Sequence, residues 1–377
     1  MVAQLVSLLA RRHDIALLCL RFPDEPPVDD VVRERCDVVE EVHRPLLARS
    51  PWRLLRETRR LRLFLDGAPP WVIGCNVADF WTRLDTLARR WRPDLVQIEY
   101  AVMGQYAQAL EDFRVNRILV DLDADGPEPD STHHRRRHIR WSGVDSWQRY
   151  RTSIMSHVEA VVVLTERDEA VIRSLGGDTL VARIPLAVEP PPAPLDPLGR
   201  PPPTLLFVGN YSHAPNVEAA RRLVGEIFPR LRQRHPELLL ELVGESPPDL
   251  TGDGVVVTGR VPDVTPYLDA AAVVAAPLGS GGGMRVKVLE ALASGKALVA
   301  SPRAIEGLDL VNGEQVLVAE SDDEFADAVS MLLGDKEARA ALAARARAWA
   351  VASLAPERSA QAYEALYDSL DRPTRVL

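Results

Sequence analysis

Residues Ala276–Ile305 read APLGSGGGMRVKVLEALASGKALVASPRAI, and this stretch determines how we interpret the rest of the chain. An apolar strand is expected to end at Pro277, and a helix over Val286–Ser294 is expected to stop at Gly295. The glycine-rich loop between them lets backbone N–H groups approach a ligand, and the helix N-terminus adds partial positive charge. A strand, glycine loop and helix in this order predict a cradle for a diphosphate in an α/β protein.

Three charged side chains lie on this predicted helix. Arg285 and Lys287 fall in its first turn, where cations oppose the helix dipole, so their presence favours an anion above them. Glu290 lies about one turn further on, and its carboxylate can accept two hydrogen bonds from a ribose diol. A glycine loop that serves only a turn, and a glutamate on a solvated helix face, are the alternatives for the same residues.

The pattern on both sides of this stretch alternates between short apolar strands and helices. Strands are expected over 204–209, 238–244, 255–258, 272–277, 297–301 and 316–318. Helices are expected over 217–234, 264–272, 286–294 and 323–333, and the tail from Lys336 is expected to be helical with a break at Pro356. The pattern predicts a doubly wound α/β domain, in which ligands bind at the carboxyl ends of the strands.

The first half of the chain predicts a second domain of the same class. A helix is expected over 2–10, and buried strands over 15–21, 94–99, 117–122 and 160–164. The segment Glu189–Pro203 has eight prolines in fifteen residues and predicts a semi-rigid spacer. The expected domains are therefore 1–188, a linker over 189–203, 204–345, and a C-terminal helix within 346–377.

Composition narrows the class of protein. The chain has 377 residues and a net charge of -9 without a long basic tract, which argues against a nucleic-acid-binding protein. Cys19, Cys36 and Cys75 share no metal-ligand spacing and are typical of a reducing compartment. No apolar run reaches about 18 residues, and the start does not resemble a signal peptide. We expect a cytoplasmic protein without a metal site.

The second half resembles the retaining glycosyltransferases of family 4, which have the GT-B fold. Besides the glycine-rich block, the resemblance rests on four short motifs: Phe207-Val208-Gly209-Asn210 with Pro215-Asn216, Gly259-Arg260-Val261-Pro262-Asp263-Val264, Pro266-Tyr267-Leu268, and Glu306-Gly307-Leu308 with Gly313. It covers about residues 204–335. A weaker likeness, at Thr165–Asp168 and Ile184-Pro185, reaches into the first half.

This resemblance implies a GT-B fold, with two Rossmann-like doubly wound domains facing across a cleft and the C-terminal helix crossing back to the first domain. The family's first domain opens with a strand and a glycine-rich loop. This chain begins inside the helix that follows them, so we expect its first domain to lack that strand.

The resemblance also implies roles for individual residues. Glu290 matches the second glutamate of the family's paired-glutamate motif and would bind the donor ribose, whereas the first falls at Gly282, which leaves contacts to the transferred sugar open. The backbone of Gly283, Met284 and Arg285 would hold the diphosphate, and Val261 and Pro262 would lie by the nucleobase. The expected donor-binding residues are Gly209, Asn210, Val261, Pro262, Gly282, Gly283, Met284, Arg285, Lys287, Leu289 and Glu290.

Three features of the first half have both a functional and a structural interpretation. Asp121 and Asp123 end a strand where the family tends to place a histidine, and we predict them as catalytic, with loop capping as the alternative. The run HHRRRHIR over 133–140 could contact phosphates or form a solvated loop. The basic stretch Arg49–Leu65 could lie on an anionic membrane surface, or pack its apolar face on the sheet with its arginines in water.

The function expected is transfer of a sugar from a nucleotide-diphosphate sugar to a carbohydrate, lipid-linked or small-molecule acceptor. The family implies retention of configuration, no essential metal and no cofactor beyond the sugar nucleotide, and its branch suggests polysaccharide or glycolipid assembly. A degenerate homologue that binds without transfer, a sugar-nucleotide epimerase of the same fold, and a plain nucleotide-binding α/β protein remain as alternatives.

Overall fold

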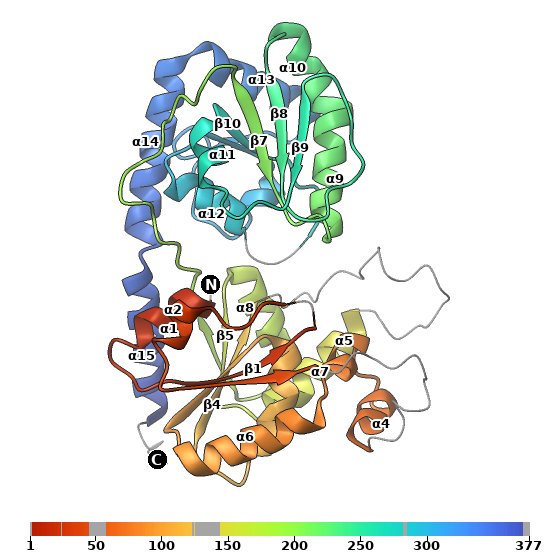
Figure 1. Ribbon diagram of the computed structural model, residues 1–377, viewed down its shortest axis with the longest axis vertical. Helices are drawn as coiled ribbons and strands as arrows, with labels where there is room; N and C mark the ends of the chain where they lie inside the picture. The colour runs from red at the N-terminus through yellow and green to blue at the C-terminus, as the bar shows by residue number, and fades with distance from the viewer. Residues whose placement is uncertain are drawn as a thin grey trace. The chain divides into compact units, whose positions relative to one another are not determined.

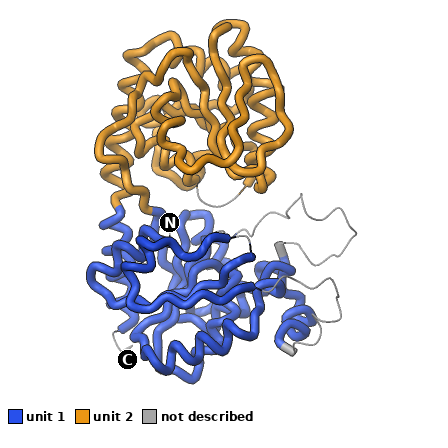
Figure 2. Tube along the Cα trace, viewed as in Figure 1, with its two compact units in different colours: residues 1–129, 137–186, 356–377 blue, residues 130–136, 187–355 orange. Residues whose placement is uncertain are grey.

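The computed structural model describes residues 2–23, 25–44, 58–122, 124, 144–281 and 285–371. The described chain forms two compact units (Figure 2): unit 1 takes the residues up to 186 and those from 356, and unit 2 takes 187–355. Both units are built from parallel strands connected mainly by helices (Figure 1). No helix of the described residues is long and apolar enough to cross a membrane.

The described residues of unit 1 form six strands and the helices that connect them. Its strands are β1 (Ala16–Arg21), β2 (Val38–His43), β3 (Leu95–Glu99), β4 (Asn116–Asp121), β5 (Ala160–Val163) and β6 (Leu180–Arg183). Its helices are α1 (Val2–Leu9), α2 (Asp30–Arg33), α4 (Thr58–Leu65), α5 (Pro70–Gly74), α6 (Ala78–Trp91), the 3₁₀ helix η1 (Ala101–Leu110), α7 (Val144–Met155), α8 (Glu166–Ser174) and α15 (Pro356–Asp371).

The parallel sheet β3-β4-β5-β6 is the centre of unit 1, and β1 pairs with β2 in a second sheet. Successive side chains of a strand point to opposite faces, so β4 contributes to two cores. Ile118 packs in the core that includes Tyr363 and Leu366 of α15, whereas Leu119 packs in the core that includes Tyr150 of α7. The C-terminal helix is thus part of unit 1, where it covers one face of the sheet.

Unit 2 contains six strands and the remaining helices. Its strands are β7 (Thr204–Val208), β8 (Leu239–Val243), β9 (Val255–Gly259), β10 (Val273–Ala276), β11 (Leu298–Ala300) and β12 (Leu317–Val318). Its helices are α9 (Ala214–Arg222), the π-helical turn η2 (Leu223–Ile227), α10 (Phe228–Arg234), α11 (Thr265–Ala270), α12 (Val286–Ala293), the 3₁₀ helix η3 (Pro302–Ile305), α13 (Asp322–Gly334) and α14 (Lys336–Ser353).

The strand order of unit 2 places its ligand-binding edge. The six parallel strands are ordered β12-β11-β10-β7-β8-β9, so the chain starts in the middle, builds outward to one side, and then returns to build the other. This is the doubly wound order in which ligands bind outside the carboxyl ends of the two central strands, where the direction of winding reverses. In unit 2 that point lies between the ends of β7 and β10.

The structure confirms the strands predicted from the apolar runs, within one or two residues at their ends. Two strands of unit 1 were missed, β2 and β6, because half-exposed strands lack a continuous apolar run. The helix predicted over 217–234 begins at Ala214 with Pro215 in its first turn, and it continues through the π-helical turn into α10.

The proline-rich stretch 189–203 differs from the predicted spacer, because it belongs to unit 2 and is fastened there. Cationic side chains donate hydrogen bonds to its backbone carbonyl oxygens. The Nζ of Lys296 donates to Asp196 O, and the Nη2 of Arg347 donates to Pro191 O over 2.6 Å. Arg339 donates in the same way to Leu198 O over 3.1 Å. Proline content predicts the absence of helix and central strand, but it does not predict independence from a neighbouring domain.

Candidate functional site

The carboxyl ends of β7, β8 and β9 all lead into glycines, and two of these backbones meet very closely. Gly244 has φ +142°, and a Cβ at this position would lie 1.7 Å from the carbonyl oxygen of Gly209. The N–H of Gly209 in turn donates to Val243 O over 2.9 Å. Side chains are therefore excluded at this point, which leaves backbone at the edge where the doubly wound order places a ligand.

The loop from β7 to α9 is held by two asparagines. The Oδ1 of Asn210 accepts hydrogen bonds from the backbone N–H of Ser212 at 2.9 Å and from its hydroxyl at 2.6 Å. The Nδ2 of Asn216 donates to Asn210 O over 2.6 Å. A Cβ on Gly209 would lie 3.2 Å from both Cβ and Cγ of Asn216. Gly209 thus provides the space that the Asn216 side chain occupies.

The start of the glycine-rich loop lies against this same segment. The Oγ of Ser280 donates to the carboxylate of Glu218 in α9 over 2.7 Å. Gly281 has φ +96°, and a Cβ there would lie 2.8 Å from Cγ of Pro215. The loop after β7 and the loop after β10, which are separate in sequence, therefore converge at the reversal point of the sheet.

Arg285 stabilises the loop from its far end. Its side chain is 7% exposed, and its Nη2 donates to Gly281 O over 3.1 Å. The same nitrogen lies 3.9 Å from Oε2 of Glu306, which also forms a 2.6 Å salt bridge with Arg303. The positive charge of Arg285, which we expected beside the diphosphate, is thus shared with a carboxylate of the chain itself.

Lys287 is held by uncharged groups. Its Nζ donates to Oδ1 of Asn216 and lies 4.6 Å from the ring centroid of Phe207, which is fully buried in β7. Among the described residues Lys287 forms no salt bridge. The pKa of Lys287 is lowered to about 7, mainly by burial and in part by the charge of Arg285, while the charge of Glu290 opposes both.

Glu290 and Leu289 lie one turn along α12. Leu289 is 3% exposed and packs in the interior, so the role of its side chain is structural. Glu290 is half-buried, and burial raises the pKa of its carboxyl. No described residue forms a hydrogen bond or salt bridge with the Glu290 side chain. A carboxylate that is partly desolvated and has no hydrogen-bond partner among the described residues is suited to accept hydrogen bonds from a ligand.

The remaining predicted donor-binding residues divide into two groups. Val261 is half-buried and Pro262 is exposed, and both follow the carboxyl end of β9, two strands away from the reversal point. Gly282, Gly283 and Met284 lie outside the described residues. The structure therefore brings together Gly209, Asn210, Arg285, Lys287 and Glu290, and it places Val261 and Pro262 at the same edge of the sheet.

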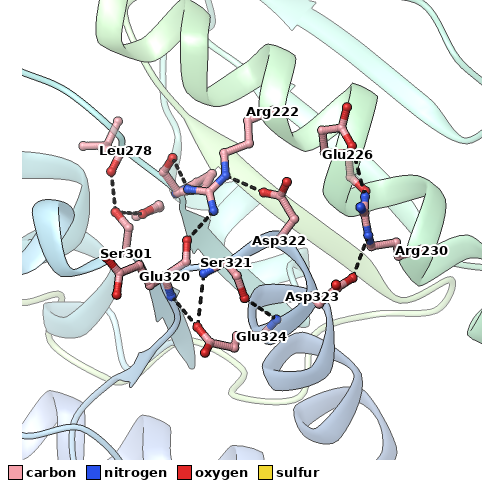
Figure 3. A network of polar contacts seen from close by, with 12 residues as sticks. Arg222, Glu226, Arg230, Leu278, Ser301, Glu320, Ser321, Asp322, Asp323 and Glu324 are labelled. Carbon is pink, nitrogen blue, oxygen red and sulfur yellow. Dashed lines mark hydrogen bonds and ion pairs between the residues drawn. The ribbon is translucent and has the colours of Figure 1, made fainter.

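A buried polar network fixes the strand end from which the glycine-rich loop departs (Figure 3). The Oγ of Ser301 donates to Leu278 O over 2.6 Å, and Ser301 also caps η3. Arg222, the last residue of α9, donates to Asp322 and to Glu320 O, each over 2.6 Å. The Ser301 contact fixes the segment that follows β10, and the Arg222 contacts join the end of α9 to the start of α13.

We expect Ser301→Ala to lower the free energy of unfolding of unit 2 by about 1–2 kcal/mol, because it leaves the buried carbonyl of Leu278 without its donor. Urea unfolding of the full chain measures this loss. Ser212→Ala, which removes an exposed hydroxyl, is the matched control and should change stability by less than about 0.5 kcal/mol. Equal effects of the two substitutions would contradict the structural role of Ser301.

Asp121 lies at the end of β4 as predicted, but not in an open position. Its side chain is 2% exposed and forms a salt bridge with Arg151 of α7, with Oδ2 2.6 Å from Nε and Oδ1 3.4 Å from Nη2. Arg151 is equally buried and stacks over Trp147 at 5.2 Å. This environment favours a structural part for Asp121. Asp123 and the run 133–140 lie outside the described residues, as does 49–57 of the basic stretch.

The roles of two residues in the unit 2 region, Asn216 and Ser301, were not predicted from the sequence, and neither was that of Arg151 beside Asp121 in unit 1. Asn216 was noted as part of a motif, but its contact with Lys287 joins positions 71 residues apart, and no local pattern reports such a pair. A serine at the end of a predicted strand, followed by proline, is a recognisable cap signal, and it could have identified Ser301.

The second unit matches a known family model. Residues 202–335 match the model described as "Glycosyl transferases group 1", which spans unit 2 from β7 to α13. A search of curated proteins finds no match. The family match thus covers the part of the chain that carries the converging loops.

Solved structures resemble the chain over nearly its full length. Sucrose-phosphate synthase from Thermosynechococcus elongatus has a TM-score of 0.69 at 18% identity, covering 98% of this chain and 92% of that one. HepE of Anabaena in complex with UDP and glucose has a TM-score of 0.64 at 15% identity, covering 97% and 96%. A glycosyltransferase from Rickettsia africae has a TM-score of 0.64 at 10% identity, covering 99% and 94%.

The likeness establishes the fold. The chain has the GT-B fold of these glycosyltransferases, with two Rossmann-like units of parallel strands. The fold predicted from the glycine-rich stretch is confirmed at this level.

Proposed function

We propose that the chain is a glycosyltransferase that moves a sugar from a nucleotide-diphosphate sugar to an acceptor, with retention of configuration and without an essential metal. The observation that carries the proposal is the placement of Lys287 and Glu290 on α12, beside the reversal point of the unit 2 sheet. One side chain is a cation without a salt-bridge partner in the described residues, and the other is a partly desolvated carboxylate. A nucleoside diphosphate matches both.

The comparisons support the donor class. HepE of Anabaena binds UDP-glucose in one structure and UDP with glucose in another, and the family model covers the same unit of this chain. In the proposed reaction the bond between the sugar and the diphosphate breaks, and negative charge develops on the departing diphosphate. The N-terminus of α12 and Lys287 would stabilise that charge, as preorganised donors and cations do in other transferases.

The acceptor is proposed as a carbohydrate or lipid-linked saccharide in polysaccharide or glycolipid assembly. The test uses donors labelled in the sugar, linked to UDP, GDP, ADP or dTDP, with and without membrane extracts as the acceptor source. A transferase releases free nucleotide and moves label to the acceptor, and the anomeric configuration of the product reports retention. Label that stays on the nucleotide in a new epimeric form would identify an epimerase, whereas binding without release would identify a non-catalytic homologue.

We further propose that unit 1 contacts an anionic membrane surface at the cytoplasmic face, through α4 and α5. One arginine of α4 points into unit 1. Arg60 is 7% exposed, and its Nε donates to Asn76 O over 2.8 Å. Phe64 and Leu65 are 48% and 68% exposed, and Trp71 of the neighbouring α5 is 44% exposed. Leu63 packs against the core of unit 1 and Arg59 and Arg62 are exposed, as in the simple packing alternative, but Arg60 faces inward while Phe64 and Leu65 remain exposed.

Charge favours the same partner. Residues 44–66 contain seven arginines and two acidic residues, within a chain whose net charge is -9. Basic residues beside exposed aromatic and aliphatic side chains are typical of helices that lie in the interface of an anionic bilayer. A lipid-linked acceptor would be presented at such a surface.

We expect Leu65→Ser to weaken binding to phosphatidylglycerol-containing vesicles about tenfold, because burial of one leucine contributes about 1.5 kcal/mol or more. Vesicle cosedimentation of the full chain measures the partition. Met331→Ser, at a residue of unit 2 that is 48% exposed, is the matched control and should not change it. Equal binding to phosphatidylcholine vesicles, or no response to added salt, would contradict the role of charge.

A further inference from the structure

Two separate parts of unit 2 contact the amine of Lys287 and fix its position. The ring of Phe207 in β7 lies beneath its amine, and Oδ1 of Asn216 in α9 accepts its hydrogen bond. Asn216 is itself anchored, because its Nδ2 donates to Asn210 O and its side chain fills the space that Gly209 leaves. The amide group of Asn216 thus has one orientation, with its oxygen toward the lysine.

The charged groups around the Lys287 amine do little to stabilise its protonated form. Along α12 and its cap, the charge of Arg285 disfavours the protonated amine and that of Glu290 favours it. Arg285 shares its own charge with Glu306. The packed segment from β7 through α9 carries five other titratable or charged groups: buried Tyr211, exposed His213, Glu218, which accepts a hydrogen bond from Ser280, Arg221, and Arg222, which pairs with Asp322.

We propose that Lys287, positioned by Asn216 against Phe207, binds the donor diphosphate and takes up a proton as the nucleotide sugar binds. The inference rests on the proposed function, and it deepens that function by naming the group that carries the charge and the residue that positions it. Asn216 is a positioning residue, since it acts through the lysine amine.

The physical basis is the change of environment on binding. In the empty site burial holds the pKa of Lys287 near 7, so at pH 8 the amine is mostly neutral. A diphosphate within a few ångströms favours the charged form and raises this pKa. Binding therefore takes up a proton between the two pKa values, and affinity falls as pH rises above 7. With the bound pKa well above 9, the loss from pH 7 to 8.5 is about tenfold.

The experiment is titration calorimetry of the full chain with the nucleotide sugar that binds best, at pH 6.5–8.5 and in two buffers with different ionisation enthalpies. The ligand is the nucleotide sugar and not the free diphosphate, because a terminal phosphate itself titrates near pH 6. We expect uptake of about 0.9 proton at pH 8 in the wild type. Lys287→Arg, which stays charged at every pH used, should bind without proton uptake and without the pH slope.

Two further variants test the positioning role and the specificity of the effect. Asn216→Asp places a carboxylate on the amine and should keep Lys287 protonated in the empty site, so proton uptake falls well below the wild-type value. His213→Asn removes the neighbouring titratable ring and should leave the slope unchanged. A wild-type slope in Lys287→Arg would overturn the inference while leaving the proposed function intact. Absence of binding to any nucleotide sugar by the wild type would overturn the proposed function itself.

Discussion

Replacing Glu290 by alanine should weaken donor binding by about 100-fold, because it removes the acceptor of two hydrogen bonds from the ribose diol. Hydrogen bonds to a charged group contribute about 1.5–3 kcal/mol each, so the loss of two corresponds to at least about 3 kcal/mol. Equilibrium binding of the nucleotide sugar to the full chain measures the effect. Glu290→Gln keeps one acceptor oxygen and should fall between the wild type and the alanine variant.

Folding should not account for this loss. The Glu290 side chain has no hydrogen bond or salt bridge to any described residue, and burial disfavours its charge, so its removal should leave the melting temperature unchanged or raise it slightly. The matched control is Glu237→Ala, an exposed glutamate that precedes β8 at the opposite edge of the sheet. Wild-type affinity in Glu290→Ala would remove this residue from the donor site.

Replacing Asp121 by alanine should lower the free energy of unfolding of unit 1 by about 3–5 kcal/mol. The substitution removes the Asp121 carboxylate from the buried Arg151 guanidinium, and removal of one partner from a buried ion pair has a cost of this size. Urea unfolding followed by tryptophan fluorescence measures it, since Trp147 lies beside the guanidinium.

The same variants separate the structural role of Asp121 from the predicted catalytic one. Asp85→Ala breaks an exposed pair with Arg89 on α6 and should lower stability far less than Asp121→Ala, which makes it the matched control. Asp121→Asn keeps the shape of the side chain. If this variant folds with wild-type stability but loses sugar transfer, Asp121 is catalytic after all; if it is destabilised and keeps transfer at low temperature, the pair with Arg151 is its function.

Much of unit 2 could be predicted from the sequence because its signals are local. β10 is a short apolar run and β7 is one after its first residue, Thr204, and α12 follows a glycine-rich loop and ends before a glycine. These patterns specify which elements form and in what order, and the doubly wound order then follows from rules that hold for most parallel sheets. The edge of the sheet that carries the candidate site could be predicted from the same local patterns and the same rules for parallel sheets.

The details of the site were not accessible, because they depend on contacts between distant residues. The sequence places Asp121 at the end of a strand, but its burial depends on Arg151, which approaches from the next helix. The sequence places Arg285 beside a helix N-terminus, but Glu306 shares its charge from beyond β11. Arg60 points inward because it donates a hydrogen bond to the backbone oxygen of Asn76. Every residue has such an oxygen, so the sequence does not show which one an arginine will contact.

The way in which the proline-rich stretch is fastened to unit 2 has an evolutionary consequence. Lys296, Arg339 and Arg347 all grip carbonyl oxygens, and a carbonyl oxygen is present whichever side chain its residue carries. Selection on these three basic residues alone can therefore preserve the attachment, while most residues of the stretch 189–203 can be substituted. Homologues should show variable sequence across 189–203 and a constant basic residue at positions 296, 339 and 347. A flexible connector would not require the three basic residues to be constant.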